Sequence, residues 1–105
     1  MNDVSLYQRI YALVKQIPLG EVVSYGTLAR MVGTTPRVVG FALAALPEQS
    51  DVPWQRVINS QGRVSARKDS DRAILQRALL EAEGVCFNAS GRVVSGLLGA
   101  DAAQL

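Results

Sequence analysis

The chain alternates between stretches where apolar residues recur at helical spacing and short breaks rich in glycine, proline and polar residues. The first stretch predicts an amphipathic helix that ends before Pro18, with apolar positions at Leu6, Ile10, Leu13, Val14 and Ile17. After a turn and a short extended connector, Ser24 is the expected N-cap of a helix over 25–32, and Gly33 is its left-handed C-cap. The buried side of that helix is expected to carry Leu28, Ala29 and Met31.

A second short helix follows directly. Thr35 is the expected N-cap, Pro36 occupies the first helical position, and the helix extends to Ala45, before Pro47. Two short helices joined by a tight turn at Gly33 have the form of a helix-turn-helix, whose second helix contacts a DNA groove. Helical hairpins of this size also occur in proteins that do not bind DNA, so the motif alone leaves the function open.

The pattern changes after the helix pair. Residues 47–68 contain prolines, a glycine and only brief apolar runs, which predicts loops and short strands arranged like a wing. Helical spacing returns after Ser70 or Asp71 and ends at Gly84, with an inward face expected at Ile74, Leu75, Ala78, Leu79 and Ala82. Together these elements predict a mainly helical domain with one modest core.

The C-terminal part predicts a small hairpin and then a tail. Residues 85–87 and 92–94 flank an Asn-Ala-Ser-Gly turn, the pattern of two short strands. Residues 95–105 are small and weakly patterned, so they are expected to form a flexible tail. A length of 105 residues therefore divides into one domain over 1–94 and this tail.

Composition excludes several classes of catalytic site. The chain has no histidine, which removes histidine general bases, catalytic triads and His-Cys zinc sites, so no metal or cofactor is expected. The single cysteine, Cys86, cannot form an internal disulfide, and it lies in an apolar run where a thiol behaves as a small hydrophobe. No basic leader precedes an apolar segment, and no apolar run reaches the roughly 18 residues that span a membrane. The expectation is a cytoplasmic protein without a membrane partner.

Charge is concentrated where the helix pair and the following loops lie. The net charge of the chain is only +2, but residues 30–68 carry six basic and two acidic residues, a local excess of +4. A basic region of this kind is the electrostatic footprint of a protein that contacts a phosphate backbone. The alternative is that these basic residues are scattered over a solvated surface.

One segment, residues 53–62, reads Pro-Trp-Gln-Arg-Val-Ile-Asn-Ser-Gln-Gly. It resembles the active-site block of the O6-alkylguanine-DNA alkyltransferases, whose signature is Pro-Cys-His-Arg-Val followed by Val or Ile. Three further segments resemble the same family in the same order: 20–29 its approach to the helix-turn-helix, 37–40 its recognition helix, and 80–84 the end of its late helix. The resemblance covers roughly residues 4–94. It implies the fold of the family's C-terminal domain, a mainly helical, winged helix-turn-helix-like domain with short strands or loops.

The signature departs from the family pattern at its centre. Trp54 stands in the cysteine position and Gln55 in the histidine position, which is the hallmark of the alkyltransferase-like proteins that bind alkylated guanine without removing the alkyl group. Alkyl transfer needs a thiolate nucleophile, which an indole cannot supply, so no catalytic residue and no enzyme activity are expected. Trp54 offers an apolar wall instead, and each methylene that it helps to desolvate is worth about 0.8 kcal/mol. Without the flanking motif, Trp54 would be interpreted as an ordinary core tryptophan.

The resemblance also implies which residues hold a flipped lesion. Arg37 falls at the family's intercalating arginine finger, and Tyr25 falls at the tyrosine beside the rotated phosphate. Arg67, with Ser65 and Ala66, falls in the loop that lines the lesion pocket, where its guanidinium would cover the flipped base. The alternatives are a surface arginine that contacts one phosphate, a tyrosine that only packs, and a solvated pair of Arg67 with its neighbour.

Other positions concern the geometry of the loop. The resemblance implies that Arg56 and Lys68 contact the DNA backbone or brace the loop. Glu83 matches the acid that orients the family's histidine, and with Gln55 in that place we expect a structural role for it. Leu46 stands where the transferases commonly have an asparagine that ties the recognition helix to the active-site loop, so this connection is expected to be held differently.

The resemblance implies a monomeric, non-enzymatic sensor of DNA damage. Such a protein binds duplex DNA through the minor groove, flips O6-alkylguanine into a pocket, and hands the lesion to the damage-recognition proteins of nucleotide excision repair. Two other functions share parts of the pattern. A winged-helix transcription regulator would bind according to base sequence, and an enzyme that used Cys86 would become covalently alkylated.

Overall fold

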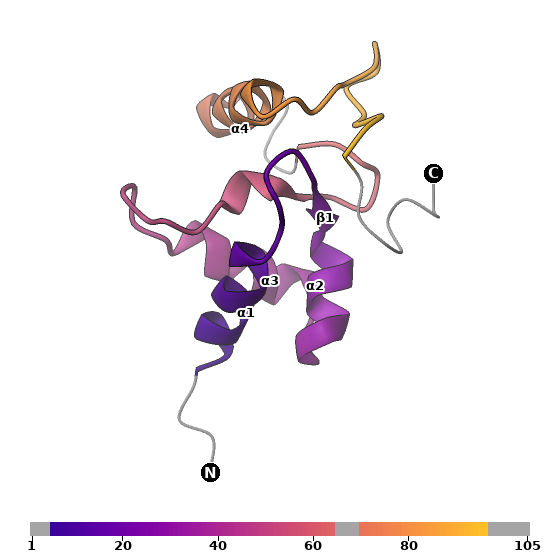
Figure 1. The fold of residues 1–105 in the computed structure, drawn as a ribbon. Helices are drawn as coiled ribbons and strands as arrows, with labels where there is room; N and C mark the ends of the chain where they lie inside the picture. Colours follow the sequence, from indigo (N-terminus) through magenta and orange to yellow (C-terminus); the bar gives the residue numbers. More distant parts are fainter. Residues whose placement is uncertain (1–4, 65–69, 97–105) are drawn as a thin grey trace.

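A computed structural model describes residues 5–64 and 70–96 of the chain. Helices are its main regular elements, with two short strands between them (Figure 1). In chain order the elements are α1 (Leu6–Lys15), β1 (Val23–Ser24), α2 (Tyr25–Val32), α3 (Pro36–Ala44), the 3-10 turn η1 (Trp54–Arg56), β2 (Val57–Ile58) and α4 (Asp71–Ala82). The prediction of a mainly helical domain is confirmed. Within the described residues, no helix combines the length and the apolar character needed to cross a bilayer.

Local capping chemistry sets the helix boundaries, as the sequence predicts. The hydroxyls of Ser24, Thr35 and Ser70 each accept the backbone N–H three residues further on, at 3.0 to 3.3 Å. Gly33 ends α2 with φ at 78°, a left-handed conformation that glycine adopts without a steric penalty. Of the two caps predicted for α4, Ser70 is the one used, and Asp71 is the first helical residue.

The first three helices pack into one bundle around a shared apolar core (Figure 1). The hydroxyl of Tyr11 on α1 donates a hydrogen bond to the carbonyl of Ala42 on α3 at 2.6 Å, which ties these two helices together. Helices α2 and α3 form the predicted helix-turn-helix, with α1 packed against both. The buried residues of this core are Ile10, Val14, Ile17, Val23, Leu28, Ala29, Val32, Val39, Ala42, Leu43, Val52 and Val57.

A two-stranded parallel sheet joins parts of the chain that are far apart in sequence. Val23 of β1 pairs with Val57 of β2, and Ser24 pairs with Ile58. A second core cluster lies around this sheet and consists of Val22, Ile58, Leu80, Val85 and Val93. The sequence predicts only an extended connector before α2, because a local pattern cannot reveal a partner strand more than thirty residues later.

Two helix faces differ from the prediction. The apolar stripe of α4 faces outward: Ile74 is 62% and Leu75 is 50% exposed, and the other members are exposed or half-buried, namely Ala78, Leu79 and Ala82. On α2, Met31 is 61% exposed, because the side of that helix that packs into the core carries Leu28, Ala29 and Val32.

A polar contact explains the orientation of α4. This helix buries Ala73, Gln76 and Leu80. The Nε2 of Gln76 donates hydrogen bonds to the carbonyls of Gln55 at 3.1 Å and Val57 at 2.8 Å. A buried carbonyl left without a donor costs about 1–3 kcal/mol, so turning Gln76 inward stabilises the segment around η1. The same rotation of α4 turns its apolar stripe toward solvent.

The hairpin predicted after α4 is present as a single antiparallel bridge between Phe87 and Val93. Around it, the backbone N–H of Asn88 donates to the carbonyl of Arg92 at 2.8 Å. The N–H of Val93 donates to the carbonyl of Gly62 at 2.7 Å, which ties the hairpin to the segment that follows β2.

The end of the described chain differs from the prediction of a tail that begins at residue 95. The Ser95 hydroxyl accepts the backbone N–H of Cys86 at 3.0 Å, and the Gly96 carbonyl accepts that of Val22 at 2.6 Å. Ser95 and Gly96 are therefore bonded to the domain, through groups that produce no apolar pattern in the sequence. Residues 97–105 lie outside the described residues.

Candidate nucleic-acid interface

Trp54 is the first residue of η1 and is half-buried against the core of the helix bundle. Its backbone N–H donates to the carbonyl of Val52 at 2.8 Å. The guanidinium carbon of Arg72 lies 4.1 Å from the centre of the indole ring, within cation–π distance. Arg72 belongs to the first turn of α4, so the indole is enclosed by the core on one side and covered by α4 on another.

A cavity of about 360 Å³ lies beside Trp54, between the end of α3 and the start of α4. Its volume falls within the range of small-ligand sites. The lining combines an apolar wall with charged residues, and consists of Leu43, Leu46, Pro47, Glu48, Trp54, Asp71, Arg72 and Leu75. Leu46, at the position where the transferases commonly have an asparagine, therefore contributes apolar surface to the cavity.

Tyr25 is the first residue of α2 and packs, half-buried, against the core of the helix bundle. Ser24, directly before it, is paired with Ile58 in the parallel sheet. Because β2 follows η1 without a break, this pairing brings the start of α2 beside the segment that carries Trp54. Two residues far apart in sequence, Tyr25 and Trp54, are thus positioned by the same pair of strands.

Arg37 is the second residue of α3, and its side chain is exposed. Its guanidinium carbon lies 5.4 Å from the centre of the Phe41 ring, which is itself 52% exposed. A Cβ added at Gly40, between them, would meet no atom within 4 Å, so internal packing does not require glycine there. The outer face of α3 therefore presents a cation and an aromatic ring beside an open stretch of backbone.

Arg56 is held within the protein by two partners. Its Nε and Nη2 donate to the carboxylate of Glu83 at 2.9 and 3.2 Å, and its Nη1 donates to the carbonyl of Ile17 at 2.8 Å. The side chains of this pair are only 15% and 12% exposed. The guanidinium of Arg56 therefore connects η1 to the end of α4, at Glu83, and to the segment just after α1, at Ile17.

Glu83 also receives hydrogen bonds from two other groups. The side-chain amide of Gln55 donates to it at 2.7 Å, and the backbone N–H of Gly20 donates at 3.5 Å. Burial by itself raises the pKa of Glu83, but the hydrogen bonds from Arg56 and Gln55, the attraction of the guanidinium and the Gly20 N–H outweigh it. The pKa of Glu83 is therefore lowered from its ordinary value of 4.5, and the carboxylate is ionised at neutral pH.

Several positions named from the sequence are not part of this geometry. Residues 65–68, which include Arg67 and Lys68 of the expected lesion loop, lie outside the described residues. Cys86 is exposed rather than covered by apolar neighbours, because it lies on the hairpin beyond α4. Within the described residues, no three His, Cys, Asp or Glu side chains gather as metal ligands.

Sequence reasoning missed Arg72 and Leu75 as residues of the cavity. Both lie in a helix that the pattern predicts correctly, but their contacts depend on how α4 packs against η1. Only the capping residue Ser70, which places the start of α4, gave a local signal for this region.

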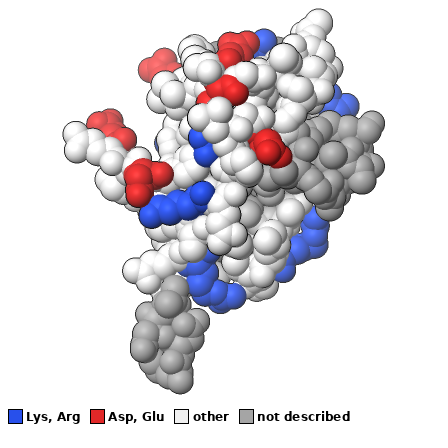
Figure 2. Space-filling view, viewed as in Figure 1, with Lys and Arg blue, Asp and Glu red and all other residues white. Residues whose placement is uncertain are grey.

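The charged residues of the surface are unevenly distributed. Figure 2 shows acidic side chains gathered over the upper part of one face, where α4 lies, while basic side chains predominate over the lower part, where α1 and α2 lie. A polyanion is attracted to the basic part and repelled by the acidic part. This distribution favours the helix bundle over α4 as the surface that contacts nucleic acid.

A small helix-turn-helix domain with a ligand-sized cavity beside a half-buried tryptophan has counterparts among known proteins. A family model for the DNA-binding domain of 6-O-methylguanine DNA methyltransferase matches residues 5–85, and the chain belongs to this family. The resemblance inferred from the sequence is thereby confirmed.

Two relatives and one solved structure illustrate the similarity. The chain is 47% identical over 88 residues to a DNA base-flipping protein of Vibrio parahaemolyticus, which covers 81% of this chain and 85% of that protein. It is 44% identical over 87 residues to alkyltransferase-like protein 1 of Schizosaccharomyces pombe, and the aligned segment covers 81% of both proteins. The crystal structure of S. pombe Atl1 with damaged DNA containing O6-carboxymethylguanine matches with a TM-score of 0.74 and 39% identity, over 89% of this chain and 90% of that one.

The network around Glu83 generates a prediction about stability. Because the folded-state pKa of Glu83 lies below the unfolded value, its hydrogen bonds stabilise the fold above the unfolded pKa and are lost as the pH falls through the folded pKa. We expect Glu83→Gln to lower the free energy of unfolding by about 1–3 kcal/mol at pH 7. We also expect this variant to lose less stability than the parent as the pH falls below the unfolded pKa of a glutamate. Urea unfolding at several pH values measures both effects.

Glu81→Gln is the matched control for this experiment. Glu81 is also a glutamate near the end of α4, but its ion pair with Arg77 is half exposed, with side-chain exposures of 52% and 45%. Exposed pairs contribute little, so its pH profile should match that of the parent. Equal effects of the two substitutions would contradict the role assigned to Glu83.

Proposed function

We propose that this protein binds duplex DNA at O6-alkylguanine, turns the damaged nucleotide out of the base stack and holds it without alkyl transfer. The observation that carries this proposal is the position of Trp54. This residue occupies the place that the family resemblance assigns to the alkyl-acceptor cysteine, and it forms a wall of the cavity between α3 and α4. The names of the relatives, a base-flipping protein and an alkyltransferase-like protein, support the same function.

The chemistry of the site argues against transfer. Alkyl transfer requires a thiolate and a group that activates it, and the indole of Trp54 supplies neither. The neighbouring Gln55 presents an amide to Glu83 where the transferases present a histidine. The chain's one thiol, Cys86, lies on the hairpin beyond α4 and does not line the cavity.

The cavity wall suits an alkyl group. Trp54 and its apolar neighbours Leu43 and Leu46 remove the alkyl chain from water, which is worth about 0.8 kcal/mol for each methylene. Pocket size discriminates only weakly between chain lengths, so the protein accepts several adducts. By resemblance, Arg67, with Ser65 and Ala66, completes the pocket over the flipped base.

Flipping needs groups outside the pocket. Extrusion of a nucleotide costs a few kcal/mol, less where damage has already weakened its pairing. Arg37 is exposed at the start of α3, and its planar guanidinium can stack on bases while it remains near phosphates, so we assign it to the gap left in the minor groove. Tyr25, at the start of α2, is assigned to the rotated phosphate. Arg56 is already bonded to Glu83 and Ile17, so its part is to brace the loop.

A protein that binds a lesion without reversing it needs a further step to restore the DNA. We propose that the bound complex is handed to the damage-recognition proteins of nucleotide excision repair. A flipped nucleotide and a covered lesion change the shape of the duplex, and proteins can recognise DNA by its shape without reading its bases.

Lesion preference is the first test. Trp54 is the chain's only tryptophan, so its fluorescence reports binding at the site. We expect the affinity for a duplex with one O6-methylguanine to exceed that for the matched guanine duplex by about tenfold or more at fixed salt. The mass of the protein should be unchanged afterwards, and Cys86→Ser should bind equally well. Equal affinities would indicate a sequence-reading regulator, and a gain of one methyl mass on Cys86 would indicate an enzyme.

The role of Arg37 is tested by Arg37→Ala. We expect weaker binding to intact and damaged duplexes, with a further loss of about tenfold for the damaged one, because only flipping needs the gap to be filled. Lys15→Ala is the control, since Lys15 is an exposed cation of α1 that pairs with Asp51. An unchanged affinity for damaged DNA in Arg37→Ala would remove the finger assignment.

Handover is tested by incision with purified excision-repair proteins. A duplex with one O6-methylguanine should be incised faster when the protein is present, because the flipped complex offers a larger distortion than the lesion alone. Trp54→Ala should lose this stimulation in proportion to its loss of lesion affinity. Slower incision in the presence of the wild-type protein would show that it shields the lesion.

A further inference from the structure

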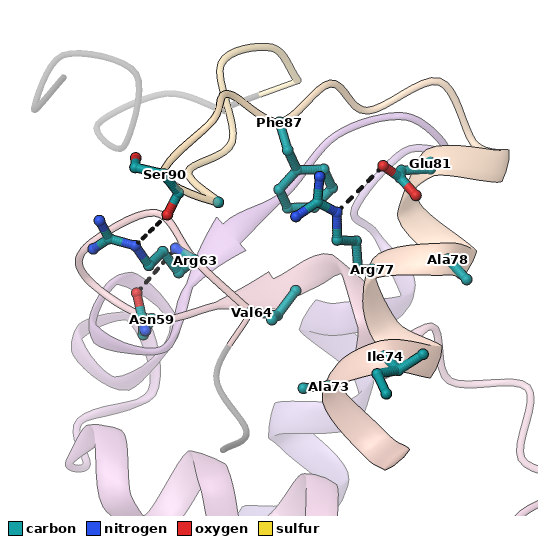
Figure 3. Close-up of a pocket in the computed structure, with 11 residues that line it drawn as sticks. Asn59, Arg63, Val64, Ala73, Ile74, Arg77, Ala78, Glu81, Phe87 and Ser90 are labelled. Atoms are coloured by element: carbon teal, nitrogen blue, oxygen red, sulfur yellow. Dashed lines mark hydrogen bonds and ion pairs between the residues drawn. The ribbon is translucent and has the colours of Figure 1, made fainter. Parts of the chain in front are cut away.

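A second, larger cavity of about 680 Å³ lies between α4 and the hairpin that follows it (Figure 3). It is formed by α4, the segment 59–64 and the turn of the 87–91 hairpin, and we call it the α4 groove. Of the residues that the structure describes, none lines both this cavity and the Trp54 cavity. Its apolar lining comes from Val64, Ala73, Ile74, Ala78 and Phe87.

Two arginines on different walls give the α4 groove a positive charge. Arg77 of α4 lies with its guanidinium carbon 4.6 Å from the centre of the Phe87 ring, and its Nε pairs with Glu81 at 3.3 Å. Arg63 donates from its Nε to the carbonyl of Ser90 at 3.1 Å, which holds it against the hairpin turn. Each guanidinium has five N–H donors, so both retain donors for a ligand. Among the described residues of the lining, Glu81 is the one acid, so these residues carry an excess of positive charge.

The rim of the α4 groove carries apolar surface that the fold leaves outside. Ile74 is 62% exposed on the groove side of α4, next to the apolar lining formed by Ala78 and Phe87. The inner side of the same helix is occupied by Gln76, which serves the carbonyls of Gln55 and Val57. Contiguous apolar surface rimmed by charged groups marks an interaction site in a protein of this size.

We propose that the α4 groove binds a peptide segment of a protein partner in which a bulky apolar side chain stands next to an acidic one. The apolar side chain covers Ile74 and the lining beneath it, and the carboxylate is received by Arg63 and Arg77. The proposal rests on the proposed function for the identity of the partner, a repair protein that takes over the lesion. The α4 groove is the surface that such a partner contacts while the helix bundle is bound to DNA.

DNA fits the α4 groove less well than a peptide does. The exposed Ile74 and the apolar lining beneath it have no complement on a DNA backbone, whereas a peptide can supply an apolar side chain beside its carboxylate. Helix α4 packs against η1, whereas the helices expected on DNA pack against one another below it (Figure 1). The lesion complex therefore leaves the groove open.

Peptide selection followed by titration tests the proposal. Random 12-residue peptides displayed on phage are selected on the full chain, and enriched sequences are synthesised with a fluorescent label. We expect them to pair aspartate or glutamate with leucine, isoleucine or an aromatic residue. In fluorescence anisotropy, Ile74→Ser and Arg77→Gln should each weaken binding about tenfold. Leu19→Ser, which changes an apolar residue that is 70% exposed outside the groove, should bind like the parent.

The same variants are titrated with the lesion duplex and compared by size-exclusion chromatography and thermal unfolding. We expect Ile74→Ser and Arg77→Gln to fold and to keep the parental affinity for DNA. The proposal is overturned if no acidic and apolar peptide is enriched, or if enriched peptides bind all variants alike. It is also overturned if the two variants lose DNA affinity as Arg37→Ala does, or if Ile74→Ser dissociates a dimer of the parent. The peptide titration contains no DNA, so its outcome does not depend on whether the protein prefers damaged DNA. A failure of the proposed lesion binding would be seen only in the titration with the lesion duplex.

Discussion

The position of Trp54 depends on one carboxylate at the end of α4. Glu83 accepts hydrogen bonds from Gln55 and Arg56, the two residues that follow Trp54 in η1, and from the backbone of Gly20 in the turn before β1. Arg56 extends the network to the carbonyl of Ile17, so three segments of the chain meet at this point. Buried ion pairs of this kind contribute geometry more than free energy. Here the geometry is the orientation of a 3-10 turn that has no side-chain cap of its own.

The same helix stabilises η1 from a second direction. Gln76, two turns before Glu83, donates to the carbonyls on either side of Arg56, those of Gln55 and Val57. Helix α4 therefore uses its inner side for polar contacts as well as for Leu80, and the larger apolar side chains of the helix lie outside. The Trp54 cavity and the α4 groove are two consequences of this one orientation, because Arg72 and Leu75 reach the first and Ile74 reaches the second.

These contacts divide the molecule by task. The outer face of α3, with Arg37, is the part that we assign to the DNA gap, and the junction of η1 with α4 is the part that we assign to the adduct. Gln55 donates a hydrogen bond to Glu83 but, unlike the histidine that the family resemblance assigns to this position, has no group that titrates near neutral pH. The contact with Glu83 is structural, and we propose that the site lacks the thiolate and the activating base that transfer requires.

The sequence could predict the elements of this fold because their signals are local. Apolar spacing placed four helices, and Ser24, Gly33, Thr35 and Ser70 placed their ends within a residue or two, since caps act on neighbouring backbone groups. The Pro-Trp-Gln-Arg segment also predicted Trp54 as a pocket residue, and Trp54 does line a cavity, although its role in lesion binding stays a prediction. Ser65, Ala66, Arg67 and Lys68 remain predictions, since they lie outside the described residues.

The tertiary structure decided which side of each element faces the core and which side faces solvent. The apolar stripe on α4 predicts that this side of the helix is buried. Instead, Gln76 faces the core, because its side-chain amide donates hydrogen bonds to two buried carbonyls about twenty residues earlier in the chain. A contact of this kind produces no periodic pattern in the sequence. The parallel pairing of β1 with β2, the stacking of Arg72 on Trp54 and the groove between α4 and the hairpin are likewise contacts across long separations. By itself, the sequence determined the local conformations and the residue type at position 54, an indole that cannot act as a thiolate nucleophile. Packing determined the orientation of those elements, because their relative rotation is set by hydrogen-bond satisfaction over the whole fold.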